Sequence, residues 1–176
     1  MKFTEIDFQG CYLIEIDKTS DVRGNFFRTW DKKEFLKNNI CSNFVQSNIS
    51  FNKKKGTIRG IHFQEHPFEE RKLVKCIKGK IFEVFIDLRK NSKTYKQWAS
   101  IELDSKENFE LFIPKGIALG MQTLEDNSEI FYQISQYYKS EFSKSIRWND
   151  PVFKIKWPLQ PTVISEKDKN CKDFSE

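Results

Sequence analysis

The sequence predicts a mostly β protein, an antiparallel sandwich or barrel of the double-stranded β-helix (jelly-roll) type with a few short helices. Short apolar segments recur up to about residue 150, and Gly, Pro, Asn and Asp separate them. The chain contains 17 Phe, 5 Tyr and 4 Trp, residue types that favour strands and pack large areas. No linker, repeat or low-complexity tract interrupts its 176 residues, so we expect a single domain over residues 1–176.

The N-terminal part of the chain contains two expected strands and one expected helix. The segments CYLIEID (11–17) and NFFRTW (25–30) have the apolar content of strands, and the polar segment between them is expected to be a turn. Residues 31–40 are expected to form a short helix, because Asp31 can cap its N-terminus and Glu34 completes a capping box.

The rest of the chain is expected to consist mainly of further strands. The segment GTIRGIHFQE (56–65) predicts one strand, and residues 72–89 are expected to form a hairpin that turns at Lys78 and Gly79. Three more strands are expected, at 97–104, 109–114 and 129–138. The Pro- and Gly-containing segment 113–126 is expected to be a loop between strands. Near the end, a helical turn over 164–170 begins at Ser165 as N-cap.

Composition limits the classes of partner and compartment. The net charge of +5 suits an anionic partner such as a phosphorylated compound, but it is too small and too dispersed to indicate nucleic-acid binding. The four cysteines form no C-x-x-C pair, which is ordinary for a reducing cytosol; they are Cys11, Cys41, Cys76 and Cys171. The N-terminus does not resemble a signal peptide, and no apolar run reaches membrane-spanning length. We therefore expect a cytoplasmic protein that does not bind membranes.

The usual cofactor and metal motifs are missing from the sequence. The two histidines, His62 and His66, are four residues apart in a strand-to-loop segment and do not form a facial metal-binding pair. The seven glycines never form G-x-G-x-x-G or a P-loop, and no serine stands in a G-x-S-x-G elbow. Neither a metal nor a cofactor is expected, which leaves acid–base chemistry.

Strand parity brings one candidate set for acid–base chemistry together. In the strand 56–65, His62 and Gln64 point to one side, whereas Arg59 points to the other. A histidine, a lysine (Lys72) and a tyrosine (Tyr132) that converge in a barrel would form a proton-transfer set with an electrostatic stabiliser.

Each member of this set also has a structural interpretation, and the residues alone leave it open. A strand histidine is more often structural than catalytic. Lys72 can extend its stem to the surface, and Tyr132 can be a core aromatic. Asp168 can simply complete the helix cap that begins three residues earlier.

A resemblance to a known family adds weight to the catalytic interpretation. Seven segments occur in the order found in the dTDP-4-dehydrorhamnose 3,5-epimerases: DVRGNFFRTW, FVQSNIS, KKGTIRGIHFQ, KLVKCIKGKIFEVFIDLRKNSKTYKQW, LFIPKGIALGMQTL, EIFYQISQYY and IRWNDPVFKIKWP. The resemblance runs from about residue 10 to 170, and the long block 72–98 is its most specific part. It implies a cupin-type jelly roll, usually a homodimer, that uses neither metal nor cofactor. It also implies epimerisation at C3 and C5 of a nucleotide-diphospho-4-keto-6-deoxy sugar, for deoxysugar or surface-polysaccharide biosynthesis.

The resemblance assigns a role to each matching position. His62 matches the family's base, and Asp168 matches the carboxylate that orients it. Tyr132 matches the proton donor on the other side of the ring, and Lys72 matches the cation near the ketone oxygen. Arg59 matches an arginine of the same pocket. His66 does not match a functional position, and we expect it at the surface.

The resemblance also implies a nucleotide-binding set. Arg23 matches an arginine that contacts phosphate, and Phe26 matches an aromatic residue near the base. Gln46 and Asn48 match polar contacts to the nucleotide.

The chain departs from the family at three positions. The family pattern P-x-G-x-A-H-G-F is PKGIALGM here, so that Leu119 replaces a pocket histidine and Met121 replaces an aromatic residue. Ile49 stands where the family often has histidine. Leu119 cannot donate a hydrogen bond, so it favours a changed sugar or inversion of one carbon only (C3 or C5), with neutral drift as the alternative.

Three alternatives to the default substrate and reaction therefore stay open. The nucleotide can be CDP or GDP and the sugar another 4-keto sugar or a heptose. The reaction can be a 3,4-ketoisomerisation on the same fold. The chain can also be a non-catalytic cupin that binds a sugar nucleotide.

Overall fold

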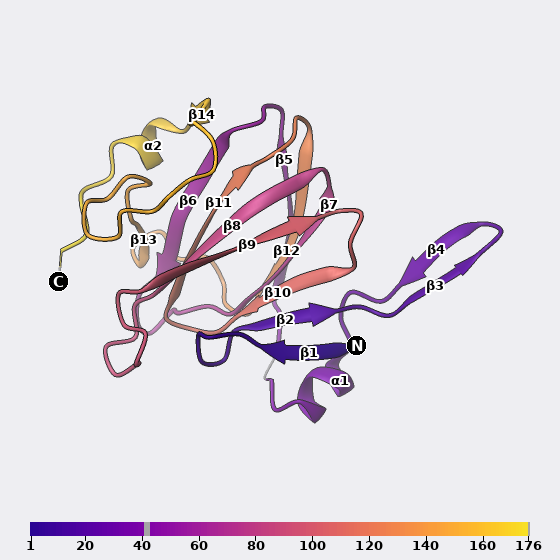
Figure 1. The fold of residues 1–176 in the computed structure, drawn as a ribbon. Coiled ribbons are helices and arrows are strands. Elements are labelled where there is room, and N and C mark those ends of the chain that lie inside the picture. Colours follow the sequence, from indigo (N-terminus) through magenta and orange to yellow (C-terminus); the bar gives the residue numbers. More distant parts are fainter. Residues whose placement is uncertain (41–42, 176) are drawn as a thin grey trace.

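The computed structural model describes residues 1–40 and 43–175, which form a mostly β structure with two short helices. Most strands belong to two sheets of six strands each, and one two-stranded hairpin extends away from the body of the molecule (Figure 1). The predicted mostly β, jelly-roll class is therefore confirmed.

The first sheet has the strand order β1-β2-β10-β7-β12-β5, and all its pairs are antiparallel. Its strands are β1 (Lys2–Glu5), β2 (Tyr12–Glu15), β5 (Gln46–Asn52), β7 (Lys72–Lys78), β10 (Phe109–Ile113) and β12 (Ser128–Ile134).

The second sheet has the order β13-β6-β11-β8-β9, and β14 adds to β6 in parallel. Its strands are β6 (Thr57–Gln64), β8 (Lys80–Asp87), β9 (Trp98–Asp104), β11 (Ile117–Thr123), β13 (Ser143–Ser145) and β14 (Val163–Ile164).

The main core lies between these two sheets. Both sheets contribute alternate apolar side chains to one buried cluster, such as Val74 from β7 and Leu111 from β10 on one side and Ile81 and Phe85 from β8 on the other. Alternation of this kind is what places every second residue of a strand inside a barrel.

Both helices begin at the predicted caps. The Asp31 side chain accepts hydrogen bonds from the backbone N–H groups of Lys33 and Glu34 at the start of α1 (Lys32–Lys37). Ser165 caps α2 (Glu166–Lys169) by accepting from the Asp168 N–H. α1 buries Phe35 in a cluster with β2, β7 and β10. None of the helices in the described ranges is long and apolar enough to cross a membrane.

The predicted hairpin over residues 72–89 is wrong. Both of its strands exist, but β7 pairs with β10 and β12, whereas β8 pairs with β9 and β11. The chain thus passes from one sheet to the other at Gly79, where φ is +74° and a Cβ would lie 2.5 Å from the Ser128 Oγ. A hairpin and an arch between two facing sheets have the same alternation of apolar residues, so the sequence pattern could not distinguish one connection from the other.

The predicted loop over residues 113–126 is also wrong. β11 occupies its centre, and all 7 residues of this strand are buried. Because β11 is buried on both of its faces, it shows no alternation of apolar and polar residues. Its Gly120 suggested a loop, but the glycine serves close packing: a Cβ there would lie 2.8 Å from Ile61 Cγ1.

The predicted turn between residues 17 and 25 contains another strand. β3 (Lys18–Asp21) pairs with β4 (Gly24–Phe27), and the hairpin they form projects from the body (Figure 1). The predicted strand over 25–30 therefore ends earlier, at Phe27. All 4 residues of β3 are exposed, so this strand has no buried face that could produce a hydrophobic period.

Candidate active site

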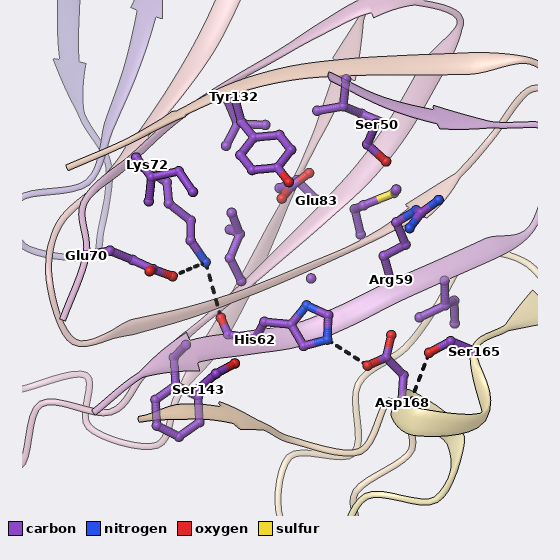
Figure 2. A pocket seen from close by; sticks show the side chains of 18 of the residues that line it. Ser50, Arg59, His62, Glu70, Lys72, Glu83, Tyr132, Ser143, Ser165 and Asp168 are labelled. Carbon is purple, nitrogen blue, oxygen red and sulfur yellow. Dashed lines mark hydrogen bonds and ion pairs between the residues drawn. The ribbon is translucent and has the colours of Figure 1, made fainter. Parts of the chain in front are cut away.

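A cavity of about 520 Å³ opens into the barrel, within the size range of small-molecule sites. Figure 2 shows that side chains from both sheets and from α2 point into it. Six of the residues selected from the sequence line this cavity, namely Arg59, His62, Lys72, Leu119, Tyr132 and Asp168.

His62 and Asp168 form a close polar contact in the cavity wall. His62 Nε2 lies 2.6 Å from Asp168 Oδ1, although 106 residues separate the two. Asp168 is 4% exposed, and its Oδ2 also accepts from the Gly60 N–H at 3.3 Å. Burial raises the pKa of the Asp168 carboxyl, but the hydrogen bonds from His62, Gly60 and Ser165 and the charge of His62 outweigh it, so the pKa lies below its usual value.

Asp168 also takes part in the helix cap, but through its backbone and not through its carboxylate. Its backbone N–H donates to Ser165 Oγ at 3.1 Å, which leaves the carboxylate free for His62. A short capped helix thus fixes the direction of the carboxylate (Figure 2).

A β-bulge in β6 corrects the predicted parity of Arg59. In the register of β6 with β11, Leu119 is opposite His62 and Met121 is opposite Arg59. These two pairs are two residues apart in β11 but three residues apart in β6. The extra residue in β6 brings Arg59 and His62 to the same cavity, against the strict alternation assumed from the sequence. Gly60 stands in this bulge with φ +104°, and a Cβ there would lie 2.8 Å from the Leu119 carbonyl oxygen.

Lys72 is held inside the cavity and does not extend to the surface. Its Nζ lies 2.8 Å from Glu70 Oε1 and donates to the His62 carbonyl oxygen at 3.4 Å. The Lys72 side chain is 11% exposed. Two fixed acceptors therefore position one cation beside the histidine.

Tyr132 projects from the sheet opposite β6 and lies across the cavity from His62 (Figure 2). Burial raises the pKa of the Tyr132 hydroxyl. The charge of Arg59 lowers this pKa and the charge of Glu70 raises it, and the net result is a pKa above the usual value. The phenol therefore keeps its proton at neutral pH and is able to donate it.

Leu119 and Met121 make part of this cavity apolar. Leu119 is 8% exposed and Met121 6%, and both also pack in the core between the sheets. The position of Leu119 opposite His62 places a side chain without hydrogen-bonding groups beside the histidine.

Arg59 stands at the exposed edge of the cavity, whereas the remaining selected residues lie outside its lining, Gln46 and Asn48 on β5 and two more on a distant hairpin. Arg59 is exposed, and its Nε donates to Asn52 Oδ1 at 2.6 Å. Gln46 Oε1 accepts from the Tyr138 N–H at 3.1 Å, and Asn48 is opposite Tyr132 in the β5–β12 register.

Arg23 and Phe26 are not brought to the cavity of their own chain. Both lie on the β3–β4 hairpin, which projects away from the barrel (Figure 1). Phe26 is 69% exposed, and Arg23 pairs with Asp21 of the same hairpin. His66, expected at the surface, is exposed beside Glu69.

Sequence reasoning missed two carboxyl residues that line the cavity, Glu70 and Glu83. Glu83 was detectable, because it lies two residues from both Ile81 and Phe85 and therefore shares their inward face of the strand. Glu70 stands in an irregular segment before β7, where no periodicity predicts its direction. Within residues 1–40 and 43–175, no three His, Cys, Asp or Glu side chains are grouped so that they could hold a metal ion.

Comparison with known proteins identifies the family. The model of the dTDP-4-dehydrorhamnose 3,5-epimerase family matches residues 5–176. The chain belongs to this family. A dTDP-4-dehydrorhamnose 3,5-epimerase from Methanothermobacter thermautotrophicus strain Delta H is 39% identical, over 99% of this chain and 95% of that protein.

Solved structures of epimerases have the same fold. The dTDP-4-dehydrorhamnose 3,5-epimerase from Bacillus anthracis str. Ames, with TDP and PPi bound, has a TM-score of 0.95 at 35% identity and covers 98% of this chain and 99% of its own. The dTDP-6-deoxy-D-glucose-3,5-epimerase from Legionella pneumophila Philadelphia 1, in complex with dTDP-4-keto-L-rhamnose, has a TM-score of 0.92 at 32% identity and covers 98% and 92%. The predicted cupin-type fold and the predicted enzyme class, an isomerase of the 3,5-epimerase family, are thus confirmed.

Proposed function

We propose that the chain inverts C3 and C5 of a dTDP-linked 4-keto-6-deoxy sugar through enolate intermediates. The observation that carries this proposal is the arrangement of His62 and Tyr132 on facing walls of one cavity, with the Asp168 carboxylate on one side of His62 and Lys72 on the other. Membership of the epimerase family supports the choice of substrate. The match of a single family model to residues 5–176 also supports one epimerase domain.

The first step is removal of a proton from a carbon next to the ketone. A C4 ketone makes the hydrogens at C3 and C5 acidic, because the resulting carbanion is delocalised as an enolate. His62 Nε2 faces Asp168, so in the tautomer that donates to this carboxylate the other ring nitrogen, Nδ1, is free to accept the proton. The Asp168 carboxylate then stabilises the imidazolium that forms.

The second step returns a proton to the opposite face of the carbon. Tyr132 is the proton donor, since it lies across the cavity from His62 and retains its proton at neutral pH. Lys72 stabilises the negative charge that develops on the C4 oxygen, and its contacts with Glu70 and the His62 carbonyl keep it in place. Inversion results because the two protons are exchanged on different faces of the ring.

The nucleotide diphosphate extends from the cavity toward the rim. Arg59, exposed at the cavity edge, is suited to a phosphate oxygen, and Gln46 and Asn48 on β5 are suited to polar contacts with the nucleotide. The described cysteines are free thiols, which supports function in a reducing cytoplasm; Cys41 lies outside the described residues.

A second copy of the chain completes the site. Arg23 and Phe26 cannot serve their own cavity from a hairpin that points away from it, and the exposed Phe26 is suited to insertion into a neighbour. In the proposed homodimer, each hairpin contributes its arginine to the phosphate and its aromatic ring to the base in the partner's cavity.

Subunit mixing tests this arrangement. The variant Arg23→Ala/Phe26→Ala and the variant His62→Asn are each expected to be inactive. When the two variants are mixed and their subunits exchange, about half of the dimers contain one chain of each. Each mixed dimer has one complete site out of two, so the mixture should recover about one quarter of wild-type activity. As a control, a single chain that carries all three substitutions should restore nothing to His62→Asn. If the first mixture also recovers nothing, the hairpin acts on its own chain or not at all.

Exchange in deuterated water tests the function itself. With dTDP-4-keto-6-deoxyglucose, the wild type should incorporate deuterium at C3 and C5, and NMR should show the inverted product. A ketoisomerase would move the ketone to C3, and a binding protein would do neither. Turnover of a CDP- or GDP-linked 4-keto sugar in place of the dTDP sugar would correct the nucleotide but keep the chemistry.

A further inference from the structure

One buried carboxyl group in the cavity has no part in the proposed mechanism. Glu83 lies in the middle of β8 and is 3% exposed. It lines the cavity, and Figure 2 shows its carboxyl on the side of Tyr132, across from His62. Its Oε2 is completely buried and has no hydrogen-bond partner in the described part of the chain.

The neighbours of Glu83 explain why it is unpaired. The residues opposite it in the flanking strands are Met121 of β11 and Ile101 of β9, and neither side chain can form a strong hydrogen bond. The charge of Lys72 lowers the pKa of the Glu83 carboxyl, but Lys72 forms its ion pair with Glu70. A buried polar group without a partner is costly, so this carboxyl is suited to a partner that enters with a ligand.

The charge state of Glu83 follows from its surroundings. Burial raises the pKa of the Glu83 carboxyl to about 8, and Lys72 opposes this shift. The Cys76 thiol of β7 lies outside the cavity lining but interacts electrostatically with Glu83. The other titratable and charged groups that line the cavity are Arg59, His62, Glu70, Lys72, Tyr132, Tyr138, Lys167 and Asp168. At neutral pH the side chain is therefore mainly a neutral acid, which can donate through its O–H and accept through its C=O.

We propose that Glu83, as a protonated carboxyl, is a specificity-determining residue that hydrogen-bonds to an oxygen of the sugar ring. A sugar hydroxyl or the C4 carbonyl oxygen is the chemical partner, since each can accept from the acid and a hydroxyl can also donate to it. The nucleotide does not contact Glu83, because the carboxyl is in the interior of the barrel and the phosphate-binding candidate Arg59 is at the exposed edge. This inference rests on the proposed sugar-nucleotide function.

Two matched variants test the role of Glu83. Glu83→Gln keeps a neutral donor and acceptor of nearly the same shape, whereas Glu83→Met keeps the length and removes both. Glu83→Gln should retain kcat/KM within about 3-fold, and Glu83→Met should lose about 10- to 100-fold, as expected when a buried polar contact is lost. In the wild type kcat/KM should fall as the pH rises through about 8, and this loss should be weaker in Glu83→Gln.

Binding separates this inference from the proposed function. Calorimetry with dTDP alone and with dTDP-glucose gives the part of the affinity that the sugar provides, without turnover. Glu83→Met should lower the affinity for dTDP-glucose about 10-fold or more and leave that for dTDP unchanged. Equal affinities of wild type and Glu83→Met for dTDP-glucose would overturn the inference, as would a Glu83→Gln variant as impaired as Glu83→Met. A wild type without deuterium exchange would instead refute the proposed function, and the binding difference would still decide the role of Glu83.

Discussion

Asp168→Asn is the change that tests the histidine–carboxylate pair most directly. Asp168 Oδ1 lies 2.6 Å from His62 Nε2, and Oδ2 accepts from the Gly60 N–H at 3.3 Å. In the variant, one of these two positions becomes an NH₂ group. If the amide oxygen keeps the bond from Gly60, the NH₂ faces Nε2, so the neutral imidazole must carry its proton on Nδ1, where the proposed base acts. If the amide is turned around, Nε2 can still donate, but the charge that stabilises the imidazolium is gone.

Both orientations predict a slower proton transfer. A hydrogen bond to a charged group contributes about 1.5–3 kcal/mol, which corresponds to a loss of about 10- to 150-fold in rate. This is less than the effect expected for loss of the base itself, because the imidazole is still present. The loss should appear in kcat more than in KM, because the charged pair stabilises a species that forms only during reaction.

Deuterium exchange at C3 and C5, followed by NMR, measures this effect. Ser165→Ala is the matched control for the cap, since it removes the side-chain acceptor of the Asp168 N–H but keeps a charged carboxylate at position 168. A lost N-cap costs about 1 kcal/mol of stability, and Ser165→Ala should reduce the melting temperature but keep the exchange rate within a few-fold. If Asp168→Asn loses stability but retains exchange, the carboxylate has a structural role only and our account of the pair is incorrect.

Three further predictions concern the cavity. His62→Asn should reduce exchange by about 100- to 10,000-fold at an unchanged circular dichroism spectrum; a variant with near wild-type turnover would exclude His62 as the base. Leu119→His should accelerate the slower of the two deuterium exchanges at C3 and C5, as measured by NMR. Equal exchange rates at C3 and C5 in the wild type would contradict this role of Leu119. The folded pKa of Glu83 is raised, so its contribution to stability is present below its ordinary pKa of 4.5 and is lost as pH rises through about 8. Urea unfolding at pH 5 and 9 should therefore show a smaller decrease in stability for Glu83→Gln than for the wild type.

The parts of the fold that could be predicted from the sequence are those with a local signal. The caps at Asp31 and Ser165 are short-range hydrogen bonds between neighbouring residues, and the sequence contains both partners. The partner of a strand is a long-range property, which is why residues 72–89 were expected to form a hairpin. β11 had no visible period because it is buried on both sides, and β3 had none because it is exposed on both.

In the candidate site, too, local features could be predicted from the sequence and long-range contacts could not. Alternation correctly gave Lys72 and Tyr132 inward directions, since β7 and β12 are regular where these residues stand. Arg59 was placed on the wrong side, because one extra residue in β6 reverses the parity beyond it and the need for glycine at position 60 arises from contact with a distant strand. Sequence distance likewise gave no indication that α2 would bring a carboxylate to His62, so that pairing came from family resemblance alone.

The fixed positions of His62 and Lys72 affect the relative rates of the two inversions. C3 and C5 lie on either side of C4, so one base can reach both only if the sugar ring turns between the two steps. In the proposed mechanism Lys72 holds the C4 oxygen as the pivot, because its contacts with Glu70 and the His62 carbonyl prevent it from following the ring. The second orientation of the ring must then be stabilised by other cavity residues, and Leu119 next to His62 offers only apolar contact. A missing hydrogen bond in one of two ring orientations slows the inversion at one carbon and leaves the chemistry at the other intact, which is why we expect Leu119 to make the two exchange rates unequal.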